Sequence, residues 1–105
     1  MKNKTKAQYE ARAKIVKAMA HPSRLFIIDK LAESEKCVQE LTKMIGADIS
    51  TVSKHLAVLK EAGIIISEKR KTSVYYKLKC PCVVNFFTCV EDVIKTNVKD
   101  AKNLI

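Results

Sequence analysis

The stretch that decides the fold is Asp48–Gly63, DISTVSKHLAVLKEAG in one-letter code. Its apolar side chains recur at the spacing of one helix face, which predicts a helix with a buried stripe. The inward positions are Val52, Leu56, Leu59 and Ala62. Asp48 can cap the start of this helix by accepting a backbone N–H bond. Gly63 stands just past its end, where glycine is the usual residue.

A shorter helix is predicted just before this one. Its apolar positions are Val38, Leu41, Met44 and Ile45, and Gly46 ends it. A short helix, a glycine-containing turn and a capped second helix together form a helix-turn-helix. In this motif the second helix enters the major groove of DNA and places its first residues on the base edges. We therefore expect a DNA-contacting surface at the start of the second helix.

The residues of this helix expected to contact DNA are Ile49, Ser50, Thr51, Ser53, Lys54 and His55. The hydroxyl side chains can donate to phosphates or base edges, and Lys54 can neutralise a phosphate. Ile49 can touch a thymine methyl group. His55 has two interpretations, a DNA contact and a histidine that packs between helices, and we favour the second.

A β-hairpin with a basic tip is predicted directly after the recognition helix. Residues 64–66 are short and β-branched, and residues 74–78 are strand-like. A charged turn, residues 68–72, lies between them. The residues of this wing expected to reach the flanking DNA backbone or the minor groove are Lys69, Arg70 and Lys71.

The remaining segments are predicted to be helical. One helix spans residues 5–20, and the next begins at His21-Pro22 and runs to about Ala32, followed by a polar turn over residues 33–36. A last helix covers most of residues 81–102. We expect a single domain over residues 1–105, mainly α with a β-hairpin wing, in the order α-α-α-α-β-β-α.

The charge of the chain is +9 and lies in two patches. Residues 1–20 hold six Lys or Arg against one Glu, and residues 63–79 hold five against one. Two basic patches that flank a balanced body predict a polyanion partner, here double-stranded DNA. No stretch approaches the roughly 18 apolar residues of a membrane span, and no signal-peptide pattern follows Met1. We expect a cytoplasmic protein with no membrane partner, whose four cysteines are thiols.

Four segments resemble the ArsR–SmtB family of metalloregulatory repressors. AMAHPSRL (residues 18–25) resembles the family's ALADPTRL, and CVQEL (37–41) resembles CVCEL. STVSKHLAVLKEAG (50–63) resembles STVSRHLAVLREAG, and VYYKL (74–78) resembles VYYRL. The resemblance implies a homodimer joined through the first and last helices, residues 1–20 and 81–102. It also implies a repressor that a bound effector releases from its operator.

The cysteines narrow the choice of effector. Many members of the family bind metal through both cysteines of CVC, but Gln39 replaces the second here and leaves Cys37 alone. Other members use Asp, His and Glu of the last helix, which holds no His in this chain. It offers Cys80, Cys82 and Cys89 instead, and three thiolates suit a thiophilic ion, As(III) or Sb(III) first. Cd²⁺ and Pb²⁺ stay open, as does Zn²⁺ with Cys37 as a fourth ligand.

The spacing of the three thiols leaves two arrangements open. Sulfurs that share one ion lie roughly 3.8 Å apart, whereas the seven residues from Cys82 to Cys89 span about 10.5 Å of helix. If the helix begins at Pro81, these thiols need another segment or subunit to share an ion. If Asn85 caps the helix, residues 80–82 are an extended lead-in that can fold back towards Cys89. Either binding bends or unwinds residues 80–84, or the site is already closed.

Three other functions compete with that of a metalloid-sensing repressor. A disulfide or sulfur bridge between two thiols would make the repressor a redox sensor, although no cysteine follows Cys89. A thiol-rich metal carrier without a DNA function would need neither the recognition helix nor the basic wing. An enzyme is not expected, because neither His21 nor His55 forms a convincing triad and no Gly-rich phosphate loop is present. No cofactor is expected to be required, and Cys37 is either a ligand or a core residue.

Overall fold

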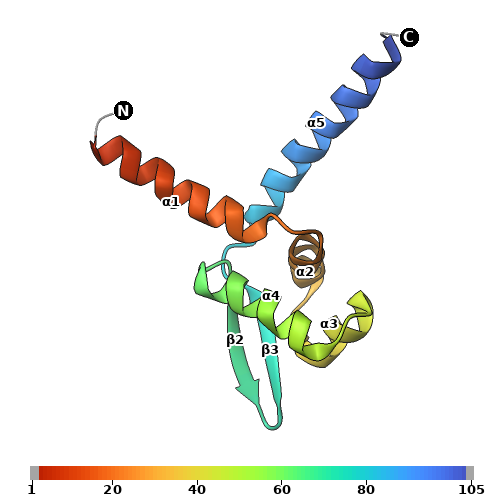
Figure 1. Cartoon of the computed structure of the whole chain (residues 1–105). Helices are drawn as coiled ribbons and strands as arrows, with labels where there is room; N and C mark the ends of the chain where they lie inside the picture. The colour runs from red at the N-terminus through yellow and green to blue at the C-terminus, as the bar shows by residue number, and fades with distance from the viewer. Residues whose placement is uncertain (1–2, 104–105) are drawn as a thin grey trace.

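The computed structural model describes residues 3–103 (Figure 1). Its elements are α1 (Asn3–Met19), α2 (Pro22–Glu33), β1 (Lys36–Cys37), α3 (Val38–Ile45), α4 (Ile49–Glu61), β2 (Ile65–Arg70), β3 (Ser73–Leu78) and α5 (Val83–Asn103). The strands form one antiparallel sheet in the order β1-β3-β2. The mainly helical winged helix-turn-helix predicted from the sequence is confirmed, with one strand more than expected.

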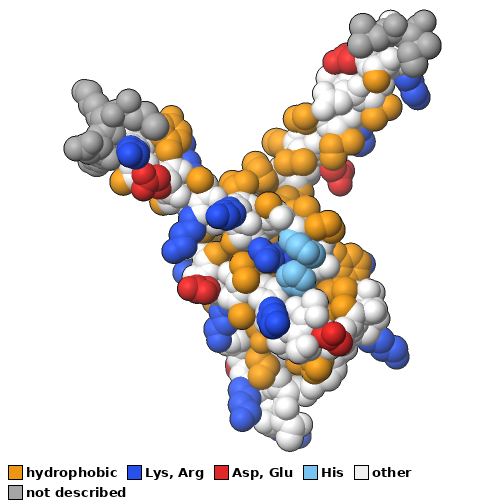
Figure 2. Space-filling model, in the orientation of Figure 1, with side chains coloured by type: hydrophobic (Ala, Val, Ile, Leu, Met, Phe, Trp, Pro, Cys, Tyr) orange, Lys and Arg blue, Asp and Glu red, His pale blue; other side chains and the backbone are white. Residues whose placement is uncertain are grey.

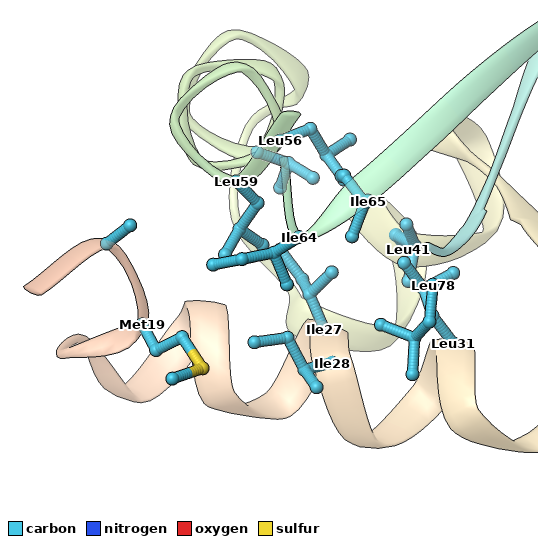
Figure 3. Packing of buried hydrophobic residues seen from close by; sticks show 12 residues of the cluster. Met19, Ile27, Ile28, Leu31, Leu41, Leu56, Leu59, Ile64, Ile65 and Leu78 are labelled. Atoms are coloured by element: carbon cyan, nitrogen blue, oxygen red, sulfur yellow. The ribbon is translucent and has the colours of Figure 1, made fainter. Parts of the chain in front are cut away.

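One hydrophobic core joins the helices to the sheet (Figure 3). Its fully buried side chains come from α2, α3, α4 and β2, and they are Ile27, Ile28, Leu41, Val52, Leu56, Leu59 and Ile65. Three of them, Val52, Leu56 and Leu59, are among the four inward positions predicted for the recognition helix, α4; the fourth, Ala62, is partly buried at the end of that helix. Burying each such side chain contributes roughly 1.5–3 kcal/mol, so the core holds α4 firmly against the body and leaves its other face to solvent.

The additional strand, β1, corrects the expected polar turn over residues 33–36. Lys36 pairs with Tyr76 of β3, and Cys37 pairs with Tyr75. Lys36 is buried at 7% exposure, and its ammonium group donates to Ser34 Oγ at 2.7 Å. A strand of two residues is too short to show the alternation of apolar and polar residues that predicts a strand. Its pairing with β3, and not its own sequence pattern, therefore defines β1.

The wing is longer, and its turn tighter, than the sequence suggested. Glu68, Lys69 and Arg70 belong to β2, where each pairs with a residue of β3. The expected turn over residues 68–72 was therefore wrong in its first three positions. The chain reverses at Lys71, whose φ of 57° lies in the left-handed region. Charged side chains suit this strand because an antiparallel hairpin can expose one face to water.

Helices α1 and α5 project from the body in different directions (Figure 1). No side chain of α5 is buried, although five large apolar ones lie along it at 41–58% exposure: Phe86, Val90, Val93, Ile94 and Val98. An apolar groove of about 430 Å³ lies where the bases of α1, α2 and α5 meet, and Val16, Leu25 and Phe86 contribute to its lining. A continuous apolar face of this kind usually marks a protein interface. None of the helices described here combines the length and hydropathy that crossing a membrane requires.

Candidate functional site

The helix-turn-helix is built by two local signals in the sequence. Gly46 ends α3 with a φ of 77°, and its N–H donates to the Thr42 carbonyl at 2.9 Å. Asp48 then caps α4, because its Oδ1 accepts from the Thr51 N–H at 2.7 Å and from Ser50 Oγ at 2.8 Å. These donors stabilise the carboxylate, the Thr51 N–H most of all, and hold the pKa of Asp48 below its usual 3.8. The predicted cap and turn are confirmed.

The front of α4 is open to solvent. The exposed side chains predicted to contact DNA are Ile49, Ser50, Thr51, Ser53 and Lys54. Ser50 and Lys54 lie on the side of α4 opposite to its buried stripe, and the other three lie closer to the stripe. Ile49 keeps 51% of its surface exposed. A short, polar helix front with one lysine can approach a groove of DNA closely and offer several donors.

His55 is half-buried and packs between helices, as its favoured interpretation proposed. Its ring lies against that of His21, with 4.3 Å between the centroids, and its Nδ1 accepts from Arg24 Nε at 3.1 Å. Burial, with smaller effects from the nearby His21 and Arg24, holds the pKa of His55 below its usual 6.5. The ring is therefore neutral at pH 7, with its proton on Nε2. His21 caps α2 in turn, because its Nδ1 accepts from the Ser23 N–H at 3.0 Å.

The wing arginine is already paired with carboxylates. The Arg70 guanidinium donates to both carboxylate oxygens of Glu35, at 2.5 and 3.0 Å, and to Glu68 at 2.9 Å. It also lies 4.9 Å from the centroid of the Tyr75 ring. These bonds, those to Glu35 first, raise the pKa of Arg70 further above its usual value. Lys69 and Lys71 are exposed on either side of it. Arg70 thus ties the wing to the segment before β1, while the two lysines extend into solvent.

The thiols lie in two environments. Cys37 is buried at the junction of β1 and α3, and its N–H donates to Glu40 Oε1 at 3.1 Å. Cys80, Cys82 and Cys89 are exposed. Within residues 3–103 no three Cys, His, Asp or Glu side chains gather closely enough to hold a metal ion. Of the two arrangements left open by the sequence, the structure has the one with separated thiols.

The start of α5 follows neither predicted boundary. The helix begins at Val83, and residues 80–82 form a turn in front of it. In this turn the Val83 N–H donates to the Cys80 carbonyl at 3.2 Å, and the Asn85 N–H donates to the Cys82 carbonyl at 3.0 Å. The extended lead-in proposed for residues 80–82 was therefore wrong, because these backbone bonds continue the helical path back to Cys80.

Comparison with known proteins identifies the family. A sequence model described as "Bacterial regulatory protein, arsR family" matches residues 21–67, from His21 into β2. The crystal structure of the transcriptional regulator HlyU from Vibrio vulnificus is 33% identical, with a TM-score of 0.68; the match covers 89% of this chain and 98% of HlyU. The chain belongs to the ArsR family.

Two further relatives of this ArsR-family chain are informative. The HTH-type transcriptional repressor SmtB of Mycobacterium tuberculosis is 36% identical over 69 residues, which are 66% of this chain and 51% of SmtB. A homodimeric winged helix-turn-helix DNA-binding domain from Mycobacterium bovis, a possible ArsR-family transcriptional regulator, is 27% identical. Its TM-score is 0.80, and the match covers 95% of this chain and 93% of the Mycobacterium bovis domain. The chain spans about half the length of the first curated relatives it matches.

Sequence reasoning missed two residues of this candidate site. Arg24 anchors His55 beneath the recognition helix, and Glu35 holds the wing through Arg70. Their pairings span 31 and 35 residues of sequence. Charge alternation signals pairing only between near neighbours, so nothing local to either residue marks its partner.

Proposed function

We propose that this chain binds operator DNA as a homodimer and represses transcription until a thiophilic effector binds. The observation that carries the proposal is the exposed front of α4, capped by Asp48, together with the exposed Lys69 and Lys71 of the wing. Phosphate contacts from such a surface position a protein on DNA, and the base contacts specify the sequence. The names of SmtB, a repressor, and of the Mycobacterium bovis domain, homodimeric and DNA-binding, support the same function.

The second copy of the chain would cover α1 and α5. The open apolar face of α5 and the groove at its base supply the surface that a dimer needs to bury. Two copies related by a two-fold axis present two recognition helices to half-sites about one DNA turn apart, ~34 Å. A rotation of one copy relative to the other would therefore move the two recognition helices out of register with their half-sites.

The effector would bind through Cys80, Cys82 and Cys89, with trivalent arsenic or antimony as the preferred ion. Each thiol releases its proton to become a ligand. Because the thiols lie apart, binding has to unwind the turn over residues 80–82 or use a thiol of the second copy. Cys89 and Val93 lie about 40° apart around the helix axis, so the site borders the proposed dimer interface. A coupling free energy of roughly 1–3 kcal/mol between effector binding and DNA binding would weaken DNA binding about 5- to 150-fold.

Lys54→Ala is expected to weaken DNA binding and flatten its salt dependence. Each lost phosphate contact lowers the slope of log K against log [salt] by about one, so a dimer should lose about two. Fluorescence anisotropy with an operator selected from random-sequence duplexes measures both quantities. Lys102→Ala, in the last turn of α5, is the matched control and should leave affinity and slope unchanged. An unchanged slope for Lys54→Ala would remove this residue from the interface.

The effector is tested by titrating the operator complex with As(III), Cd²⁺, Zn²⁺ and an oxidant in parallel. As(III) should release the wild type, whereas Cys80→Ser/Cys82→Ser/Cys89→Ser should stay bound. Cys37→Ser, at the buried cysteine, is the control and should still respond. Release of the triple variant from the operator by As(III) would contradict the thiol site. Release of the wild type only by Cd²⁺, Zn²⁺ or the oxidant would identify that agent as the effector instead. Tight metal binding by a chain that binds no duplex would instead indicate a metal carrier.

A further inference from the structure

Arg24 is a half-buried cation that the structure pairs with no carboxylate. Its Nε donates to His55 Nδ1 at 3.1 Å, and its Nη1 donates to the Ala18 carbonyl at 3.2 Å. Both acceptors are neutral, and the ion pairs found among residues 3–103 do not include Arg24. Two of the five guanidinium N–H groups are thus used, which leaves a rigidly held fork with three donors. A partly buried charge without a counter-charge favours an anion from outside the chain.

A basic groove lies beside this arginine. Its volume is about 320 Å³, and it runs between the second half of α1 and the end of α4. Lys14, Lys17 and Arg24 line it against a single carboxylate, that of Glu61. The groove is therefore positive, and it is large enough to hold a phosphate group with its water.

The two histidines extend the donor surface next to the groove. The Nδ1 atom of His21 accepts from the Ser23 N–H, and that of His55 accepts from Arg24. Because each Nδ1 is an acceptor, each neutral ring carries its proton on Nε2 and can donate from there. Figure 2 shows both histidines at the surface, on a face where Lys and Arg side chains continue from the wing to the base of α1.

The basic groove and the apolar groove lie on different sides of α1. Lys14 and Lys17 line the α4 side of that helix, whereas Val16, Met19 and Ala20 line the groove on its α5 side. The apolar side can therefore pack in a dimer while the basic side remains on the face that carries α4. Because the groove lies between α1 and the end of α4, it would lie between each recognition helix and the two-fold axis in a dimer whose axis runs beside α1.

We propose that the groove lined by Lys14, Lys17 and Arg24 binds backbone phosphates of the DNA that lies between the two half-sites. The inference rests on the proposed DNA-binding function and adds to it a contact outside the recognition helix and the wing. A guanidinium fork matches two phosphate oxygens, and the lysines act as point charges beside it. Contacts of this kind add affinity without reading sequence.

The test compares wild type with Lys14→Gln/Lys17→Gln, since glutamine keeps helix propensity and Arg24 remains in place. With two copies in the dimer, up to four contacts are lost, so the slope of log K against log [salt] should fall by roughly 2–4. At moderate salt the affinity should fall by at least about tenfold. Phosphate ethylation of the selected operator should interfere with wild-type binding at central positions, and this interference should vanish for the variant. Lys99→Gln/Lys102→Gln, at the far end of α5, removes the same charge and should match wild type.

The outcomes separate this inference from the function on which it rests. Failure of the wild type to bind any duplex would overturn the proposed function itself. Wild-type binding with an unchanged slope and unchanged interference in Lys14→Gln/Lys17→Gln would overturn only the phosphate contact. Titration of the DNA-free protein with pyrophosphate supplies a second arm, followed by NMR shifts around Arg24. Micromolar binding that the variant loses while its DNA binding stays intact would assign the groove to a small anion instead.

Discussion

Replacing Val93 with aspartate is expected to convert the protein to monomers and to remove most of its affinity for DNA. Val93 is 58% exposed in a single chain and lies on the open apolar face of α5. In a two-fold dimer the substitution buries two carboxylates against apolar partners, at about 2 kcal/mol or more each. Together these raise the dissociation constant of the dimer roughly 1000-fold. Because linking two half-site contacts adds about 100-fold or more to affinity, a monomer should lose at least that much.

Sedimentation equilibrium and anisotropy titration measure the two parts of this result. Thr88→Asp is the matched control, because it adds the same charge to α5 on the face turned away from Val93 and Phe86. It should remain dimeric and bind DNA as wild type does. A Val93→Asp protein that stays dimeric would show that the open face of α5 is not the dimer interface. A monomer with full affinity would mean that one recognition helix suffices.

Leu56→Ala is expected to cause the largest loss of stability. Leu56 is 1% exposed and extends from α4 into the core beside Leu59 and Ile65 (Figure 3). Removing three buried carbons leaves a cavity that the surrounding side chains only partly fill, which costs about 2–5 kcal/mol. Domains of this size have total stabilities of roughly 5–15 kcal/mol, so the midpoint of unfolding should fall clearly. The same change loosens the helix that would read DNA.

Urea unfolding at several protein concentrations gives this difference and separates folding from association. Ile49→Ala removes as many carbons from the same helix, but at a side chain that is 51% exposed, and it should cost less than about 1 kcal/mol. Equal losses for both variants would mean that the α4 side chains do not form the core as described. The comparison therefore tests which face of α4 is buried, and with it which face is available to DNA.

The helix-turn-helix could be predicted from the sequence because its determinants are local. The buried stripe of α4 repeats at helical spacing, Asp48 caps the helix from the residue before it, and Gly46 makes the turn through its own backbone conformation. None of these depends on a distant partner. His55 was left with two interpretations, and its packing against His21 and Arg24 became clear only from the structure.

The parts that the sequence did not reveal depend on partners far along the chain. The strand β1 is only Lys36 and Cys37, and it exists because Tyr75 and Tyr76 pair with it. The sequence suggested that Arg70 is free to contact DNA, yet its guanidinium donates to Glu35, which lies 35 residues earlier in the chain. The candidate cysteines were identified from their residue type and spacing. The distances between their sulfur atoms, however, depend on the backbone path of residues 80–82, which hydrogen bonds from Val83 and Asn85 fix.

The position of Cys37 has a mechanical consequence. This residue ends β1 and directly precedes the first residue of α3, while the salt bridge from Glu35 to Arg70 holds the wing to the same short segment. Because β1 runs directly into α3, a tilt of the sheet would also shift the start of the helix-turn-helix. An effector that acts on the proposed dimer would therefore be expected to turn each helix-turn-helix together with its wing, relative to the other copy.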